Sequence, residues 1–345
     1  PAEPFTYLVP PFVYVVVPLI DIIIGKDKNN VLKDDFDGLL ENGYFDFLVY
    51  SHVYIQYFLL GWTCYILSTE SLSGFQVLGL FVSQGIYSGT IINVAHELGH
   101  RKSSMAQIHS KVALISVCYY HFFVEHNRGH HVHVATPKDP ATSKKNQSVY
   151  GFWIQTVLGS FKSAWNIEKV QNERTGKGLW WQNQVLWGLL ASLAVYIIIT
   201  VFFTSIFNAN IGLIVRFLLI QAVIAFLLLE TVNYVEHYGI QRREISPGRY
   251  EKVNPLHSWN ANHFYSNLLL FNLQRHSDHH AYASRPYQVL RHFEESPQLP
   301  FGYPLMIVMS LFPPIWFWVM NKKLEKWQEN AFDAENIKHV VQQFA

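Results

Sequence analysis

The chain has 345 residues, of which 50% are hydrophobic and 16% aromatic, whereas only 15% are charged, which is few for a soluble protein of this length. Its formal net charge of +1 gives no broad basic surface, so no nucleic-acid partner is expected. Its two cysteines, Cys64 and Cys118, form no CxxC pair, and nothing therefore indicates a disulfide framework or an iron–sulfur cluster. The composition predicts a membrane protein.

Five segments carry few or no charges and are long enough to cross a bilayer as helices. In chain order they are residues 5–24, 47–67, 75–95, 185–207 and 211–234. Prolines 10, 11 and 18 and Asp21 interrupt the first segment, so we expect it to be irregular. The short connection 208–210 makes the last two a transmembrane hairpin. The first residue is Pro1 and not methionine, so we expect the true N-terminus to lie further upstream.

The loops predict an orientation. Residues 68–74 and 208–210 contain no Lys or Arg, whereas the opposite ends of the spans carry Lys26, Lys28, Arg101, Lys102, Arg242 and Arg243. The positive-inside rule places these ends in the cytoplasm. The polar segments 96–182 and 235–300 are then expected to form one cytoplasmic cap, followed by a segment, 301–345, at the membrane surface or in the cytoplasm. The predicted fold class is an all-α polytopic membrane bundle with a histidine-rich helical cap, in a single domain, 1–345.

Histidines dominate the polar segments. The spacing H-x3-H occurs at His96/His100, His126/His130 and His276/His280, and it places both imidazoles on one helix face. His131 and His279 adjoin these pairs, and His237 ends a predicted span. Nine histidines exceed the three or four ligands that one zinc ion uses, so two metal ions are expected. Imidazole ligands suit Fe, Zn, Cu or Ni, and the spacing does not choose among them.

Other interpretations exist for each pattern. HELGH at residues 96–100 is by itself a zinc-protease signature, with Glu97 as general base. The recurrence of H-x3-H beyond other spans makes that interpretation less favoured. Isolated histidines are expected to make ordinary polar contacts, and they are His52, His109, His121, His257, His292 and His339. His133 and His263 lie nearer the clusters.

Four blocks of sequence together carry a resemblance. They are "NVAHELGHR", "EHNRGHHVHVATPKDPAT", "NYVEHYG" and "LQRHSDHHAYASRPYQVLR". With these blocks the whole chain resembles the membrane alkane 1-monooxygenases (alkane omega-hydroxylases), within the superfamily of membrane fatty acid desaturases and hydroxylases. Two details depart from the family pattern: Arg101 stands where lysine is common, and a proline is missing near Ala283.

The resemblance implies a sixth span, before Pro1, and it also implies an activity and its cofactors. It implies a non-haem di-iron centre that uses O2 to hydroxylate the terminal methyl group of medium-chain alkanes in the bacterial cytoplasmic membrane. Electrons would come from rubredoxin, itself reduced by rubredoxin reductase. The implied iron ligands are His96, His100, His126, His130, His131, His237, His276, His279 and His280. A related hydrocarbon or fatty-acyl hydroxylase or desaturase remains an alternative, as does a membrane zinc protease.

Acidic residues near these histidines are candidates for orienting them. A carboxylate that accepts the free ring N–H of a ligand fixes its tautomer. The candidates are Glu97, Glu125, Asp139, Glu236 and Asp278. Glu230, Asn233 and His237 share one helix face, and Glu230 lies deep enough that an unpaired charge would be unfavourable.

Two further sites are proposed on weaker signals. Val13, Val17 and Ile20 recur on one face of the first predicted span, where they line either an alkane channel or the lipid. An electron donor must be a separate protein, because the chain has no CxxC pair. An acidic partner would be attracted by Lys144, Lys145, Arg242, Arg243, Arg285 and Arg291.

Overall fold

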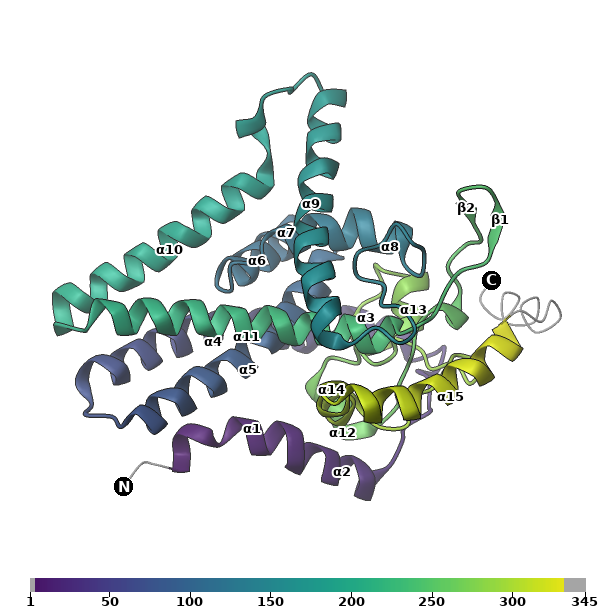
Figure 1. Cartoon of the computed structure of the whole chain (residues 1–345), viewed down its shortest axis with the longest axis horizontal. Coiled ribbons are helices and arrows are strands. Elements are labelled where there is room, and N and C mark those ends of the chain that lie inside the picture. The colour runs from purple at the N-terminus through teal and green to yellow at the C-terminus, as the bar shows by residue number, and fades with distance from the viewer. Residues whose placement is uncertain (1–3, 332–345) are drawn as a thin grey trace. The chain divides into compact units, whose positions relative to one another are not determined.

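The computed structural model describes residues 4–331 and is mostly helical (Figure 1). The chain forms two compact units. The first unit comprises residues 1–15, 42–127 and 161–229, and the second comprises 16–41, 128–160 and 230–345. Two long helices, α9 (Val149–Arg174) and α11 (Ile211–His237), contribute residues to both.

Long helices build the first unit. They are α4 (Gly43–Thr69), α5 (Gly74–Gly99), α10 (Gln184–Phe207) and the first part of α11. Figure 1 shows α10 and α11 joined by a short connection at one end. Among the described residues, α5, α10 and α11 are long and apolar enough to cross a membrane. These helices match three of the predicted spans, and α4 contains the whole of the segment predicted at residues 47–67.

Side-chain caps explain where these helices begin. The Asn42 side chain accepts a hydrogen bond from the Tyr44 backbone N–H ahead of α4. Ser73 and Gln76 form a reciprocal capping box at the start of α5. At the other end, α10 ends at Phe207, because the next residue, Asn208, has a left-handed conformation that stops the helix.

The first predicted span is irregular, as its prolines indicate. It consists of η1 (Pro4–Tyr7), α1 (Val9–Pro11), η2 (Phe12–Val16, a π-helix) and α2 (Val17–Ile24). Proline lacks the N–H that a regular helix needs, so the ladder of hydrogen bonds is interrupted there.

Shorter elements complete the first unit. α6 (Ser104–Ile115) and α7 (His121–Glu125) follow α5, and η4 (Trp180–Gln182) precedes α10. A hydrophobic core that includes Leu60, Phe81 and Phe217 packs between the long helices.

Short helices and loops dominate the second unit. The chain enters it within η3 (His126–His130, a π-helix), and α8 (His131–His133) follows. The remaining elements are α3 (Phe36–Glu41), β1 (Glu244–Ser246), β2 (Arg249–Tyr250), η5 (Pro255–His257), α12 (Phe264–Leu269), α13 (His276–Ala281), η6 (Tyr287–Val289), α14 (Tyr303–Ser310) and α15 (Pro313–Ala331).

The second unit has its own core. Trp259, Trp316, Tyr234 and Tyr238 are buried at its centre. Strands β1 and β2 pair as a small antiparallel hairpin, which the all-α prediction did not include. The segment 301–345 is described as far as residue 331, so His339 lies outside the described residues.

Candidate metal centre

Three of the nine predicted ligands meet in the first unit. His96 lies in the last turn of α5, His100 caps that helix and His126 begins η3. The ring centroid of His96 lies 4.9 Å from that of His100 and 4.5 Å from that of His126. The Nε2 atoms of His100 and His126 lie 3.1 Å apart. Residues 26 positions apart in sequence are thus brought together with their nitrogens converging.

Glu97 is paired with a cation beside these histidines. Its Oε1 accepts hydrogen bonds from Nε and Nη2 of Arg101 at 3.2 and 3.1 Å. Arg101 also forms an ion pair with Asp46. The charge that Arg101 retains in place of the common lysine therefore serves to bind Glu97.

Four further predicted ligands converge in the second unit, and all four are buried. They are His130, His237, His276 and His280, whose candidate ligand atoms lie within 4.8 Å of one another. Nε2 of His276 lies 2.9 Å from Nε2 of His280 and 3.3 Å from Nε2 of His237. The remaining pair, His131 and His279, also meets in this unit, with Nε2 atoms 3.2 Å apart.

Local backbone geometry places these side chains. η3 is a π-helix, a rare form that is frequent at functional sites, and His126 and His130 are its two ends. α13 is a single short helix in which the spacing i, i+3, i+4 puts its three histidines on one side. It follows a turn in which Phe271 and Asn272 both have φ of 53°, an unusual conformation for residues other than glycine.

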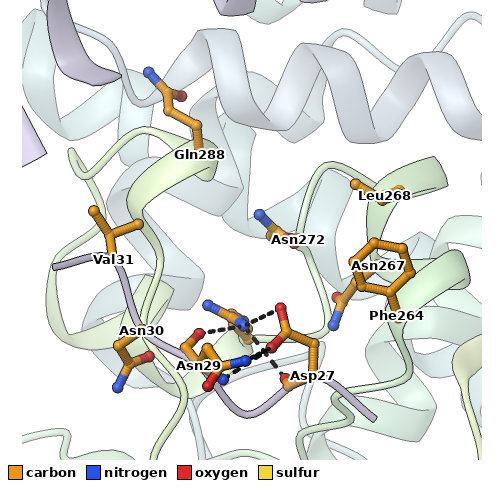
Figure 2. A pocket seen from close by; sticks show the side chains of 10 residues that line it. Asp27, Asn29, Asn30, Val31, Phe264, Asn267, Leu268, Asn272 and Gln288 are labelled. Carbon is orange, nitrogen blue, oxygen red and sulfur yellow. Dashed lines mark hydrogen bonds and ion pairs between the residues drawn. The ribbon is translucent and has the colours of Figure 1, made fainter. Parts of the chain in front are cut away.

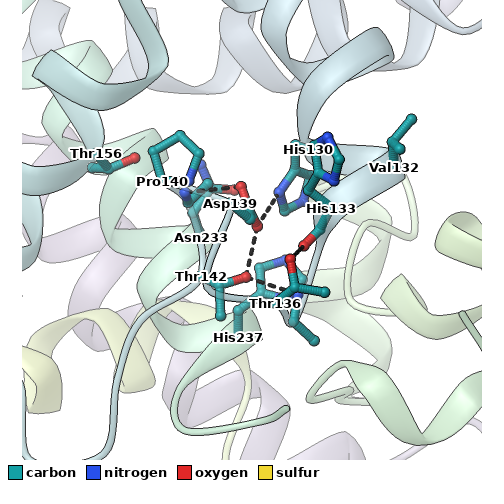
Figure 3. A network of polar contacts seen from close by, with 12 residues as sticks. His130, Val132, His133, Thr136, Asp139, Pro140, Thr142, Thr156, Asn233 and His237 are labelled. Carbon is teal, nitrogen blue, oxygen red and sulfur yellow. Dashed lines mark hydrogen bonds and ion pairs between the residues drawn. The ribbon is translucent and has the colours of Figure 1, made fainter. Parts of the chain in front are cut away.

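Asp139 orients one of the buried imidazoles (Figure 3). Its Oδ2 lies 2.9 Å from Nδ1 of His130 and accepts a hydrogen bond of 2.6 Å from the Thr142 hydroxyl. Its Oδ1 accepts the backbone N–H of Ala141 at 3.0 Å. Burial by itself would raise the pKa of Asp139, but the charge and hydrogen bond of His130 and the hydrogen bond of Thr142 lower it below its usual value. Asp139 is therefore held as a carboxylate.

His280 is held in its neutral form. Burial lowers its pKa well below the ordinary value, and the neighbouring histidines His276 and His131 lower it further. A neutral imidazole is the form that binds a metal ion.

Glu236 contacts Nε2 of the His276 imidazole, whereas Asp139 contacts Nδ1 of His130. Its Oε2 lies 3.2 Å from Nε2 of His276, the nitrogen that also faces His237 and His280. An orienting carboxylate would instead accept from the opposite ring nitrogen, as Asp139 does at His130. Tyr303 lies beside Glu236, and burial, followed by the charge of this carboxylate, raises the pKa of Tyr303 well above its usual value.

The buried carboxylate of Glu230 has polar neighbours. Its Oε2 accepts hydrogen bonds from the Thr156 hydroxyl at 2.6 Å and from Nδ2 of Asn233 at 3.0 Å. Figure 3 shows Thr156, Asn233 and His237 near the Asp139 network. In the first unit, Glu125 accepts a longer hydrogen bond from Ser163, at 3.4 Å.

Asp278 binds arginines, where we had expected it to orient a neighbouring histidine. Its Oδ2 accepts from Nη1 of Arg285 and from the backbone N–H of Arg291, and its Oδ1 accepts from Nε and Nη2 of Arg291, all at 2.9–3.1 Å. Both guanidinium groups lie over the ring of Tyr282, at 4.7 and 5.0 Å from its centroid. Tyr282 was not among the predicted site residues, although its position two residues after His280 was a usable signal.

The other predicted docking residues differ in how firmly they are held. Arg242 donates to the backbone carbonyls of Val132 and Glu251, so part of its side chain is structural. Arg243 pairs with Glu251 at 3.3 Å, and Lys145 pairs with Glu325 at 3.3 Å. Lys144 is exposed.

The three predicted channel residues lie on the less exposed side of their helices. Val17 is fully buried, and Val13 and Ile20 are half-buried. The outward side carries exposed residues, among them Leu19 and Ile23.

A polar cavity of about 290 Å³ adjoins the start of α13 in the second unit (Figure 2). Arg275, the residue before His276, donates from Nη1 to the Leu290 carbonyl at 2.7 Å and from Nη2 to the Asn29 carbonyl at 3.0 Å. Asparagines 29, 30, 267 and 272 line much of the wall. Such a wall does not suit a hydrocarbon. What this region contributes is an attachment between two segments: the hydrogen bond from Arg275 to the Asn29 carbonyl ties residues 27–31 to the start of α13.

The isolated histidines mostly make the expected polar contacts. His109 contacts the Tyr54 hydroxyl at 2.8 Å, and Nδ1 of His52 lies 2.7 Å from the Leu48 carbonyl. His257 lies 3.2 Å from Glu251. His121 differs, because both of its ring nitrogens are buried without a hydrogen-bond partner among residues 4–331.

Comparisons with known proteins agree on a family. The model of the fatty acid desaturase family matches residues 73–310. An alkane 1-monooxygenase of Acinetobacter baylyi is 40% identical over 318 residues, which cover 91% of this chain and 76% of that protein. Alkane 1-monooxygenase 2 of Pseudomonas aeruginosa is 44% identical over 308 residues, covering 88% and 80%. The xylene/toluene monooxygenase hydroxylase component XylM of Pseudomonas putida is 27% identical over 259 residues, covering 74% and 66%.

Proposed function

Because this chain belongs to the alkane 1-monooxygenases within the fatty acid desaturase family, we propose that it hydroxylates the terminal methyl group of medium-chain alkanes. The proposed cofactor is a pair of non-haem iron ions, and the proposed co-substrate is O2. The observation that carries the proposal is the convergence of imidazole nitrogens within each unit, on side chains that are buried except for the half-buried His100 and His131.

The spacing of these nitrogens fits metal ligation. Two imidazole nitrogens bound at right angles to one ion, each about 2.1 Å from it, lie about 3 Å apart. The Nε2 atoms of His276 and His280 are separated by 2.9 Å, and those of His100 and His126 by 3.1 Å. Hydrogen bonding explains the arrangement less well, since Nε2 of His276 faces two other Nε2 atoms at once.

The ligands divide between two ions in this proposal. One ion is held by His130, His237, His276 and His280. The other is centred on His96, His100 and His126, and the pair His131 and His279 completes the nine. Bound iron would supply the activation of O2 that attack on an unactivated C–H bond requires.

The chain's own residues prepare this centre. Asp139 contacts Nδ1 of His130 at 2.9 Å, and by accepting the proton of this nitrogen in a hydrogen bond it would leave Nε2 available to hold an iron ion. Thr142 and the Ala141 N–H fix the carboxylate, so the imidazole cannot turn freely. Thr156 and Asn233 stabilise the charge of Glu230 on the helix that carries His237.

A zinc protease is disfavoured by the surroundings of Glu97. A protease of the HExxH type needs this carboxylate as a general base. Here two hydrogen bonds from Arg101 occupy its Oε1, so this oxygen is not free to accept a proton from water. The second group of buried histidines also has no role in that mechanism.

The substrate is proposed to reach the centre from the bilayer. An alkane has no polar handle, so it binds by burial of its CH2 groups, at ~0.8 kcal/mol each. Val13, Val17 and Ile20 are the proposed channel residues, and their less exposed side supports this assignment.

Rubredoxin is the proposed electron donor, and the second unit is its proposed docking surface. Lys144, Lys145, Arg242, Arg243, Arg285 and Arg291 all belong to that unit. Asp278 holds the last two against Tyr282, which lies two residues beyond His280. A fixed pair of cations beside a ligand helix would bring an acidic protein close to the metals.

The chain is a membrane protein, and we propose that it lies in the bacterial cytoplasmic membrane with the histidines on the cytoplasmic side. The absence of Lys and Arg from residues 68–74 and 208–210 supports this orientation.

Metal and product analysis test the proposal together. Purified protein should contain two iron ions per chain, and supplied with octane, O2 and reduced rubredoxin it should form 1-octanol, identified by mass spectrometry. One zinc ion per chain without oxidation would sink the proposal. Oxidation of a fatty acyl chain or an aromatic methyl group, in place of octane, would contradict the proposed substrate but agree with the proposed di-iron centre.

A further inference from the structure

Residues 104–125 connect two groups of predicted ligands in the first unit. α6 runs from Ser104 to Ile115, a turn follows at Ser116–Tyr120, and α7 runs from His121 to Glu125. The flanking residues His100 and His126 lie side by side, with Nε2 atoms 3.1 Å apart. The chain therefore leaves and returns at the same place. α6 spans only about 18 Å, whereas the hydrocarbon layer is about 30 Å thick.

The turn lies beside the middle of the long helices. A Cβ at Gly188 of α10 would clash with the Tyr120 ring, so the two segments approach closely there. Two turns further along α10, the Tyr196 hydroxyl donates to the Ser116 carbonyl at 3.1 Å. Ser116 thus contacts a helix that is long and apolar enough to cross a membrane, about 18 Å from its first residue.

Side chains of the long helices satisfy the backbone at the end of α6. A helix end inside a bilayer leaves carbonyls that water cannot reach. The Tyr57 hydroxyl donates to the Val112 carbonyl at 2.8 Å, and Nε2 of Gln221 donates to the Ser116 carbonyl at 3.1 Å. Nε2 of Gln56 donates to the Ser116 hydroxyl at 3.2 Å.

These polar groups are buried. Gln56, Ser116 and Gln221 have no exposed surface, and Tyr196 is 8% exposed. Polar residues at this depth are unfavourable unless they bind one another. Their common target is the turn between α6 and α7.

We propose that residues 104–125 form a re-entrant hairpin that reaches about halfway into the membrane, and that Gln56, Tyr196 and Gln221 lock its turn in place. The hairpin enters and leaves on the face that carries His100 and His126. Because α7 leads directly into His126, the lock also positions this histidine. This inference refines the expectation that all of segment 96–182 lies in an aqueous cap, and it does not depend on the reaction that the protein catalyses.

Cysteine labelling in sealed membrane vesicles tests the topology. The tip carries the native Cys118, and replacing Cys64 with Ala leaves it as the single thiol. Ser103→Cys and Ser71→Cys, each in a background without Cys64 and Cys118, mark the hairpin entrance and the opposite loop. An impermeant maleimide should label the Ser103 variant only in inside-out vesicles and the Ser71 variant only in right-side-out vesicles. Cys118 should resist labelling in both until denaturant is added.

Two results would overturn the topology. Labelling of Cys118 from the Ser71 side would show that the segment crosses the membrane. Labelling of Cys118 from the side that labels the Ser103→Cys variant, and at the same rate as in that variant, would show that the turn lies in water.

A matched pair of variants tests the lock. Gln221→Met keeps the size of the side chain but cannot donate to Ser116. With the permeant N-ethylmaleimide, Cys118 of this variant should react about fivefold faster, the change expected for the loss of one hydrogen bond. Gln76→Met is the control, because Gln76 is also a buried glutamine but accepts a hydrogen bond from the Ser73 backbone N–H at the start of α5 and bonds to no residue of the lock. Equal reactivity of Cys118 in both variants would show that Gln221 does not hold the turn.

Discussion

The two groups of histidines differ in how their surroundings hold them. In the second unit, His130, His237, His276 and His280 are all buried, and Asp139 fixes His130 through a hydrogen bond of 2.9 Å. In the first unit His100 is only half-buried. The acidic residue beside it, Glu97, binds Arg101.

This difference bears on rigidity. A ligand whose second ring nitrogen binds a buried carboxylate has one tautomer and one orientation before the metal arrives. A half-buried imidazole is more easily reached by solvent, so a metal ion bound to it is released more easily. If both groups bind iron, the ion of the second unit should be held more tightly.

Removal of one ligand should have the largest effect in either group. We expect His96→Ala, His130→Ala and His279→Ala each to lower bound iron and to reduce turnover by at least about 100-fold, because an imidazole is lost from the coordination sphere. Iron by plasma mass spectrometry and 1-octanol formation are the measurements. His109→Ala is the control, since His109 contacts Tyr54 and the Met105 carbonyl. Normal iron and full activity in any of the three would remove that residue from the ligand set.

Asp139→Asn should distinguish the two groups. The amide keeps the shape of the side chain but loses the charge that stabilises the proton on His130, so iron affinity should fall by about 10- to 100-fold at one ion only. Titration with a competing chelator measures it. Asp35→Asn, at an exposed site, is the control. Equal weakening of both ions would mean that the groups are not independent.

Chelation of the unmodified protein should proceed in two phases. The ion near the half-buried His100 should leave about tenfold faster than the ion held by four buried histidines, because a smaller opening exposes it. Iron release is followed by absorbance of a coloured ferrous chelate. A single phase that removes both ions would contradict the comparison between the two groups.

Reversal of charge on the second unit should slow electron delivery. We expect Lys144→Glu with Lys145→Glu to reduce rubredoxin-driven turnover about fivefold at low ionic strength and to flatten its salt dependence, without loss of iron. Initial rates across a salt series are the measurement. Lys162→Glu with Lys169→Glu, on residues of the first unit, provides the matched control. Slower turnover only in the Lys162→Glu, Lys169→Glu variant would show that rubredoxin docks on the first unit instead.

The channel assignment should give the smallest change. Val13→Trp should shift product formation toward shorter alkanes, by about fourfold for each CH2 that the larger ring excludes. The profile across octane, dodecane and hexadecane measures the shift. Ile23→Trp is the control, because Ile23 is 82% exposed. Identical profiles for the two variants would assign Val13 to the lipid.

The sequence by itself determined the helices and the ligand candidates. Apolar runs with few or no charges predicted α5, α10 and α11, because in a bilayer a helix satisfies every backbone group within the segment itself. The spacing H-x3-H marked the histidines because the period of a helix is local and is visible in a few residues. The prolines at 10, 11 and 18 likewise indicated the broken helix that ends at Ile24.

Only the tertiary structure decided which groups meet. Spacing along one helix carries no information about a partner far away in sequence, so it did not separate the histidines into those of α5 and those gathered around His237. For the same reason Asp139 and Asp278 looked alike, although one contacts His130 and the other binds Arg285 and Arg291. The depth of the turn at Ser116 was also hidden, because the side chains that satisfy it, Gln56, Tyr196 and Gln221, come from three different helices.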